Sequence, residues 1–268
     1  MFVLIWSPGV GKASFQERSI GYWFRQNLKA SFGTYEGKDP AYRSRMYEHS
    51  LNAIKAMGTN ALPYLLKEAF TPPRNSAVSS LSQKLLSVLP QSWSLPPSTS
   101  RDDISRHAVE VICECRPSAK YILPPLLVFL GGTNVELHTR ALRILQKTDG
   151  PVDEAIPYLT RDLANSDPRI FSEAFGVLSD RSKAQNALPA LIGYLKTTNP
   201  QLLYCTLSIL RALGNDAEKA VPILEQIFLG ATNWNTRCDL AETLTAIDNR
   251  QGQLVVPVLL EKFESETN

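Results

Sequence analysis

The sequence predicts an all-α fold, a right-handed solenoid (superhelix) in which antiparallel helix pairs stack one after another. Three observations carry this prediction. A short signature recurs along the chain at regular spacing, apolar residues follow each copy with helical periodicity, and no alternating strand pattern of useful length occurs. A solenoid buries its core between neighbouring repeats, and 268 residues are enough to build a substantial core.

The signature is a proline flanked by aliphatic residues, with the form Ala-Leu-Pro-x-Leu in its clearest copies. Its six prolines are Pro63, Pro124, Pro157, Pro189, Pro222 and Pro257. From Pro124 onward these prolines are 33, 32, 33 and 35 residues apart, and the gap of 61 residues before Pro124 is close to two periods. The repeat period is therefore about 33 residues.

Each signature is expected to open a helix, because proline is tolerated in the first helical turn, where its missing N–H has no partner to lose. Counted from the proline, position −1 is always Leu, Ile or Val, and position +2 is always Leu. Position +6 is Ala69, Leu130, Leu163, Leu195, Phe228 and Phe263 in turn. Positions −1, +2 and +6 share one helical face, which we expect to form the core.

A first helix precedes each of these second helices, and capping residues indicate where several of the first helices begin and end. Asp-Pro or Asn-Pro pairs at Asp39, Asp167 and Asn199 place a capping side chain before a first-turn proline, while Asn134 and Asn233 are predicted to cap without proline. Gly58 and Gly214 follow first helices as expected C-terminal stops.

Two stretches depart from the repeat. Residues 1–38 are interpreted as an N-terminal apolar lead-in followed by an aromatic capping segment, in which Ile20–Arg25 forms a helix that covers the first repeat. Residues 39–268 form the repeat array, with one helical run at about Ser76–Leu89 and a Pro/Ser-rich irregular loop at residues 90–100.

Helix pairs of this length, with Asp/Asn-Pro before the first helix and Ala-Leu-Pro-x-Leu opening the second, resemble HEAT repeats. The resemblance covers about residues 39–265 and is closest to bacterial HEAT-like proteins, including those grouped with phycobilisome-lyase-type repeats. Arg43 and Arg237, each four residues after a capping residue, match a position that often carries Arg in HEAT first helices. The other repeats depart from this pattern, which puts a continuous Asp–Arg ladder in doubt.

Composition argues against several classes of function. The net charge of +2 predicts no strong overall attraction to nucleic acid or acidic membranes, although residues 1–60 carry eight Lys/Arg against four Asp/Glu and residues 199–268 carry five against nine. Four sparse cysteines, Cys113, Cys115, Cys205 and Cys238, do not form a disulfide framework and are interpreted as small buried residues.

Catalytic, cofactor and metal sites are predicted to be absent, so the chain is not expected to be an enzyme. Residues 7–14 are similar to a phosphate-binding loop, but Trp6 replaces its first glycine and Ala13 its Mg²⁺-binding hydroxyl. His49, His107 and His138 lie far apart on different expected helices, which favours structural roles over a metal site.

The resemblance implies that the second helices line the concave side of the solenoid. On each helix, the direction opposite the core face falls on the proline and positions +1 and +4. The residues there that we predict to bind a partner are Tyr64, Lys67, Tyr158, Arg161, Gln226 and Glu261. Aromatic residues and Arg are favoured at interface centres, while a solvated face with chance aromatics is the alternative interpretation.

The leading functional hypothesis is a non-catalytic protein–protein interaction scaffold that uses this concave face to bind an unidentified protein. The alternatives are an enzyme-associated HEAT module, lyase-like or chaperone-like, and less favoured, a nucleic-acid-binding HEAT protein. No small-molecule substrate is indicated. The apolar start, Met1–Trp6, leaves two expectations open: a cytoplasmic protein if Met1 is the true start, or a membrane-anchored or cell-envelope protein if an anchor lies upstream.

Overall fold

The computed structural model describes residues 14–33, 39–71 and 100–267, with side chains described as far as Leu260. These residues divide into two compact units. Unit 1 runs to Ile122 and includes Lys147–Asp149, whereas unit 2 comprises Leu123–Gln146 and the chain from Gly150 onward. Each unit is described by itself.

Unit 1 is built around a layer of helices that begins with the aromatic segment expected at the N-terminus. Its elements are α1 (Ile20–Ser31), α2 (Pro40–Ala56), the 3₁₀ turn η1 (Gly58–Ala61), α3 (Leu62–Phe70), α5 (Arg101–Cys115) and the start of α6 (Ala119–Leu130). Helix α1 packs along α2, and α3 packs on α5. Trp23 and Phe24 of α1 are buried, so the aromatic residues of this segment contribute core to unit 1.

A small hairpin precedes α1, although the sequence contains no alternating pattern that predicts it. Strands β1 (Ser14–Phe15) and β2 (Arg18–Ser19) pair antiparallel over two residues each. The turn between them places Gln16 and Glu17 at φ of 48° and 62°. The indole Nε1 of Trp23 donates a hydrogen bond of 3.1 Å to the Phe15 carbonyl, which ties the hairpin to α1.

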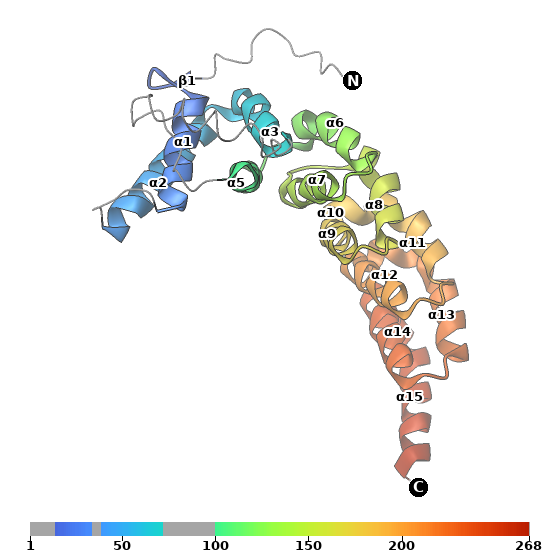
Figure 1. The fold of residues 1–268 in the computed structure, drawn as a ribbon. Coiled ribbons are helices and arrows are strands. Elements are labelled where there is room, and N and C mark those ends of the chain that lie inside the picture. The colour runs from blue at the N-terminus through green and yellow to red at the C-terminus, as the bar shows by residue number, and fades with distance from the viewer. Residues whose placement is uncertain (1–13, 34–38, 72–99, 268) are drawn as a thin grey trace. The chain divides into compact units, whose positions relative to one another are not determined.

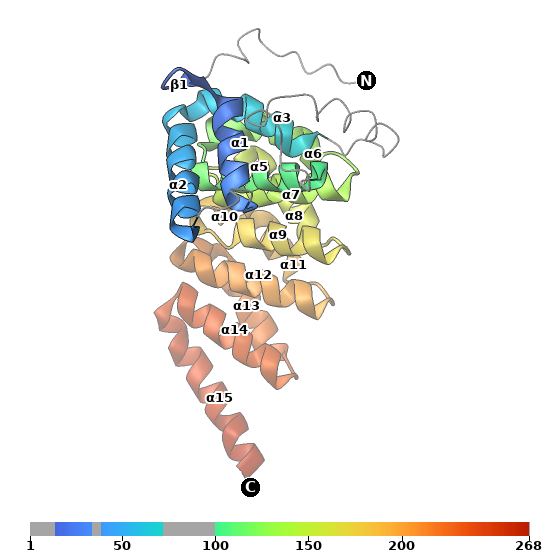
Figure 2. The same cartoon turned by 60° about the vertical axis from the view of Figure 1, so that its left-hand side comes forward.

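Unit 2 consists of two layers of stacked helices (Figure 1). One layer holds the first helices of the repeats, α7 (Val135–Lys147), α9 (Pro168–Leu178), α12 (Pro200–Leu213) and α14 (Trp234–Ile247). The other holds the second helices, which are α6 from Leu123 onward, α8 (Ile156–Leu163), α11 (Leu188–Tyr194), α13 (Val221–Gly230) and α15 (Gly252–Thr267). Figure 2 shows α9, α12 and α14 one below another. The predicted all-α solenoid of antiparallel helix pairs is confirmed.

Short turns join the two helices of each pair in unit 2. They are η3 (Asp153–Ala155), α10 (Arg181–Ala184) with η4 (Gln185–Ala187), η5 (Gly214–Ala220) and η6 (Asn249–Gln251). Lys183 of α10 is buried, and its ammonium donates to the carbonyls of Leu145 and Gln146 at 3.1 and 2.8 Å. These are carbonyls of the last turn of α7, where a cation is favourably placed against the helix dipole.

The predicted helix caps are present. The side chains of Asp39, Asp167, Asn199 and Asn233 accept hydrogen bonds from backbone N–H groups in the first turns of α2, α9, α12 and α14. Asn134 accepts from the Leu137 N–H at 3.1 Å at the start of α7. Gly58 and Gly214 have φ of 56° and 57°, the left-handed region that glycine enters without steric cost.

The signature proline lies in the first turn of α3, α8, α11 and α13, as expected. In α6 and α15 the prediction is wrong, because the α-helix begins five residues earlier and Pro124 and Pro257 lie inside it. A proline inside a helix donates no bond to the carbonyl four residues before it. Helix α15 therefore lacks one backbone hydrogen bond, and α6, which also contains Pro125, lacks two.

The core face predicted for the second helices is buried until the last repeat. At position −1, exposure is 6–9% for Leu62, Leu123, Ile156, Leu188 and Val221, and the leucines at +2 from Leu65 to Leu224 are fully buried. In α15, however, Val256 at position −1 is 52% exposed. The predicted core face is therefore not buried at position −1 of α15.

Several sequence predictions fall outside the described residues. These are the apolar start Met1–Trp6, the sequence similar to a phosphate-binding loop up to Ala13, the helix at Ser76–Leu89 and nearly all of the loop at residues 90–100. The domain boundary after residue 38 stays a prediction. Within the described ranges, no helix is long and apolar enough to cross a membrane.

Candidate interaction surface

A strip of small and apolar residues runs over three consecutive second helices of unit 2. In each of these helices (α6 from Leu123 onward, α8 and α11), two residues are exposed. They are the signature proline and the residue four positions after it. These residues are Pro124, Val128, Pro157, Arg161, Pro189 and Gly193, which we call the second-helix strip. The residues at +1, Pro125, Tyr158 and Ala190, are half-buried. Arg161 is therefore the one charged side chain among these six exposed residues.

Arg161 is held in place although its side chain is 55% exposed. Its Nε and Nη2 both donate to Asp162 Oδ1, at 3.1 and 3.0 Å, and Nη2 also donates to the Leu130 carbonyl at 3.1 Å. The guanidinium carbon lies 5.5 Å from the centre of the Tyr158 ring, within cation–π range. The contact with Leu130 also covers a carbonyl at the end of α6.

A buried carboxylate, hydrogen-bonded to a buried histidine, lies next to Arg161. Asp162 is fully buried, and its Oδ2 lies 2.6 Å from Nε2 of His138, which is itself buried in α7. Because an ionised carboxylate only accepts, Nε2 of His138 carries the proton in this contact. Asp162 thus joins a buried histidine from the first-helix layer to an exposed arginine on the second-helix strip.

Two of the predicted partner-binding residues, Tyr158 and Arg161, are brought together in this way. Gln226 is exposed on α13, and the side chain of Glu261 on α15 lies outside the described residues. Tyr64 and Lys67 belong to α3 of unit 1, where Lys67 is exposed. The assignment of all six residues to a partner site stays a prediction.

Tyr64 is more enclosed than the sequence predicts for a partner-binding residue at position +1 of α3. Its hydroxyl lies 3.4 Å from the position that a Cβ on Gly21 would occupy, and its ring packs edge-on against Phe24 with centroids 5.8 Å apart. Burial and the neighbouring Glu68 carboxylate raise the pKa of Tyr64 to about 12. The ring therefore contributes to the packing of α3 on α1.

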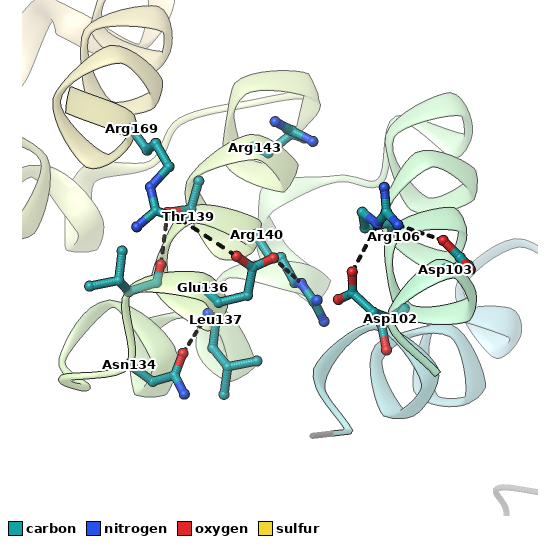
Figure 3. Close-up of polar contacts among 12 residues, drawn as sticks. Asp102, Asp103, Arg106, Asn134, Glu136, Leu137, Thr139, Arg140, Arg143 and Arg169 are labelled. Carbon is teal, nitrogen blue, oxygen red and sulfur yellow. Dashed lines mark hydrogen bonds and ion pairs between the residues drawn. The ribbon is translucent and has the colours of Figure 1, made fainter. Parts of the chain in front are cut away.

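The opposite face of unit 2, formed by the first helices, carries ion pairs that link α7 to α9 and α12 to α14. Arg143 of α7 contacts Glu173 of α9 at 3.0 Å, and Arg211 of α12 contacts Glu242 of α14 at 2.7 Å. Figure 3 shows Glu136 of α7 between Arg140, at 3.1 Å, and Arg169 of α9, at 4.0 Å. We call these contacts the first-helix ladder.

The histidines take structural roles. His49 packs edge-on against Trp23 with centroids 5.1 Å apart, and His107 is buried with its Nε2 2.9 Å from Asn27 Oδ1. Desolvation lowers the pKa of His107, and the Glu110 carboxylate opposes this effect. Within the described part of the chain, no group of three or more His, Cys, Asp or Glu residues is arranged to hold a metal ion.

Sequence reasoning identified Arg161 and Tyr158 but missed the partners that hold them. Two signals were available in the sequence. Arg161 and Asp162 are adjacent near the end of α8, and His138 follows the capping Asn134 by four residues. Neither signal predicts a contact by itself, since the His138–Asp162 bond joins residues 24 apart and the Arg161–Leu130 bond joins residues 31 apart.

Neither a family model nor a curated protein matches this chain. Among solved structures, a designed armadillo repeat protein in complex with the peptide (KR)4 is 15% identical, over 85% of this chain and 99% of that chain, with a TM-score of 0.38. An engineered protein is 17% identical, over 85% and 97%, with a TM-score of 0.38. Kap121p bound to Pho4p is 12% identical, over 91% of this chain and 28% of that chain, with a TM-score of 0.45. Likeness at this level concerns fold alone.

Proposed function

We propose that this chain is a non-catalytic scaffold that binds a protein partner across its second helices. The observation that carries the proposal is Arg161, an exposed guanidinium that is already fixed by Asp162 and Leu130 in the middle of an otherwise small and apolar strip. Arginine beside an aromatic ring is favoured at interface centres, and a side chain that is fixed before binding loses less conformational entropy on binding.

The contrast between the two faces of unit 2 supports the same proposal. Charged residues on the first-helix face pair across successive repeats in the first-helix ladder. The second-helix strip offers flat apolar surface that a partner can cover without desolvating many charges. Gln226 and Glu261 extend the predicted site along the other second helices of unit 2, and Lys67 stays a predicted partner residue on α3 of unit 1.

The strip is poorly suited to nucleic acid. Affinity for a phosphate backbone comes from several cations that follow the chain, whereas the second-helix strip carries Arg161 alone. For an enzyme-associated module, lyase-like or chaperone-like, the described residues provide no specific supporting contact. Protein binding is therefore the function that this geometry favours.

Photo-cross-linking from both faces tests the proposal. A Cβ at Gly193 would meet nothing within 4 Å, so a photoreactive residue there is tolerated on the strip. Ser172, exposed on α9 of the first-helix layer, is the matched control position. We expect a recurrent protein adduct at position 193 that excess unlabelled protein competes away and that Arg161→Glu reduces. Equal capture at position 172, or capture at 193 without competition, would contradict the proposal.

A further inference from the structure

We infer that the second-helix strip accepts an extended partner segment with a carboxylate at its centre and an apolar side chain on each side. This inference rests on the proposed function and adds the chemistry of the partner. Its basis is the order of residues along the strip, in which Val128 and Pro124 come before Arg161, and Pro189 and Gly193 come after it.

The guanidinium of Arg161 has donors left for a partner. A guanidinium has five N–H groups. The Nε hydrogen and the two on Nη2 are used by Asp162 Oδ1 and the Leu130 carbonyl. The two hydrogens on Nη1 are engaged by no contact within the described residues. They are the donors available to an oxygen of the partner.

A carboxylate is the acceptor that this position favours. Charge-assisted hydrogen bonds to a carboxylate are roughly twice as strong as neutral ones, and no exposed anion on these three second helices competes for Arg161. The internal pairing with Asp162 fixes the guanidinium without covering it, because its side chain stays 55% exposed. A doubly charged phosphate fits less well, since phosphate recognition normally uses a cluster of arginines.

Helix spacing sets the length of the segment. Packed helices lie about 8–10 Å apart, and a segment in the extended polyproline II conformation advances about 3.1 Å per residue with about three residues per turn. The partner therefore covers one second helix with about three residues, and its side chains three positions apart face the same side. When a carboxylate residue of the partner lies over Arg161 on α8, the partner residue three positions to one side lies over α6. The residue three positions to the other side lies over α11. Val128, 59% exposed, offers apolar contact on the α6 side. Gly193 leaves room for a side chain on the α11 side.

Synthetic peptides titrated into the isotope-labelled full chain test the inference by NMR. The probe is the capped nonapeptide Ser-Leu-Ser-Ser-Glu-Ser-Ser-Leu-Ser, and its matched controls carry Gln or phosphoserine in place of Glu. We expect the Glu peptide to shift the Arg161 Nε–H and the Gly193 amide, and the Gln peptide to bind at least about ten-fold more weakly.

Protein variants separate charge from preorganisation. Arg161→Gln should lower the affinity for the Glu peptide to that of the unaltered chain for the Gln peptide. Arg161→Lys keeps the charge but loses the paired contact with Asp162, and should lie between them. Arg143→Gln, on the first-helix ladder, should leave the affinity unchanged. The comparison of Glu with Gln peptides on the unaltered chain remains decisive even where an Arg161 variant folds poorly.

The possible outcomes distinguish this inference from the proposed function. Equal shifts with Glu and Gln peptides at the strip would overturn the inferred preference for a carboxylate, and the proposed scaffold function would be unaffected. Tighter binding of the phosphoserine peptide would also overturn it, in favour of a phosphorylated partner. Shifts confined to the first helices would overturn both proposals. No shift with any peptide would overturn the inference alone, because cross-linking at position 193 tests the scaffold independently.

Discussion

The two faces of unit 2 use arginine in different ways. On the first-helix face, Arg143 and Arg211 each reach a glutamate on the next first helix, so charges from successive repeats pair with one another. On the second-helix face, Arg161 reaches its own neighbour Asp162 and the end of α6, and its Nη1 makes no contact within the described residues. Ion pairs thus link neighbouring first helices on one face, while a single fixed charge, Arg161, distinguishes the other face, which we propose as the surface for binding.

The largest effect should come from the buried carboxylate that supports Arg161. Asp162→Ala leaves His138 buried without its partner and frees Arg161, and should cost about 3–5 kcal/mol of unfolding free energy. Urea denaturation followed by circular dichroism measures the loss. A loss no larger than that of Glu173→Ala on the first-helix ladder would break the contrast between the faces.

The core between the two layers should be nearly as sensitive. Leu191→Ala removes a fully buried side chain at position +2 of α11 and should cost about 2–5 kcal/mol. Val128→Ala, on the exposed strip, is the matched control and should cost less than about 0.5 kcal/mol. Similar midpoints for the two variants in urea would contradict the assignment of core and strip.

Replacing the two kinds of arginine sharpens the comparison. Arg161→Ala leaves Oδ1 of buried Asp162 without its donor and should cost about 1–2 kcal/mol. Arg143→Ala breaks an exposed pair on the first-helix ladder and should cost about 0.5 kcal/mol or less. Thermal denaturation at low and high salt distinguishes them, because salt screens the exposed pair more strongly.

The smallest of the main effects should be a gain in stability at Gly193, an exposed position of the strip. Gly193→Ala adds a methyl group where nothing lies within 4 Å and should stabilise α11 by about 0.5–1 kcal/mol. Gly214→Ala is its matched opposite, because φ of 57° there strains any residue with a Cβ, and it should destabilise. Calorimetry on both variants checks the signs. Destabilisation by Gly193→Ala would mean that a side chain at position 193 does not have the open space described above.

The sequence predicted the features that depend on neighbouring residues. Capping by Asp39, Asp167 and Asn199 follows from one side chain and the next helical turn, and the core positions follow from helical periodicity. The strip was predicted in part, since the proline and position +4 are exposed on α6, α8 and α11. Position +1 is half-buried, as at Tyr158, whose ring lies 3.8 Å from the position that a Cβ on Gly131 would occupy. A projection of a single helix does not include such neighbours.

What the sequence by itself determined is the repeat: its period, most of its helix starts, its core leucines and the identity of Arg161 as a surface residue. Only the tertiary structure decided what Arg161 does. Its anchors are the Leu130 carbonyl in the preceding second helix and Asp162, which is in turn held by His138 in the first-helix layer. The exposure of Val256 at position −1 of α15 was likewise visible only in the tertiary structure. Such contacts depend on how repeats pack against one another, and periodicity within one helix carries no information about its neighbour.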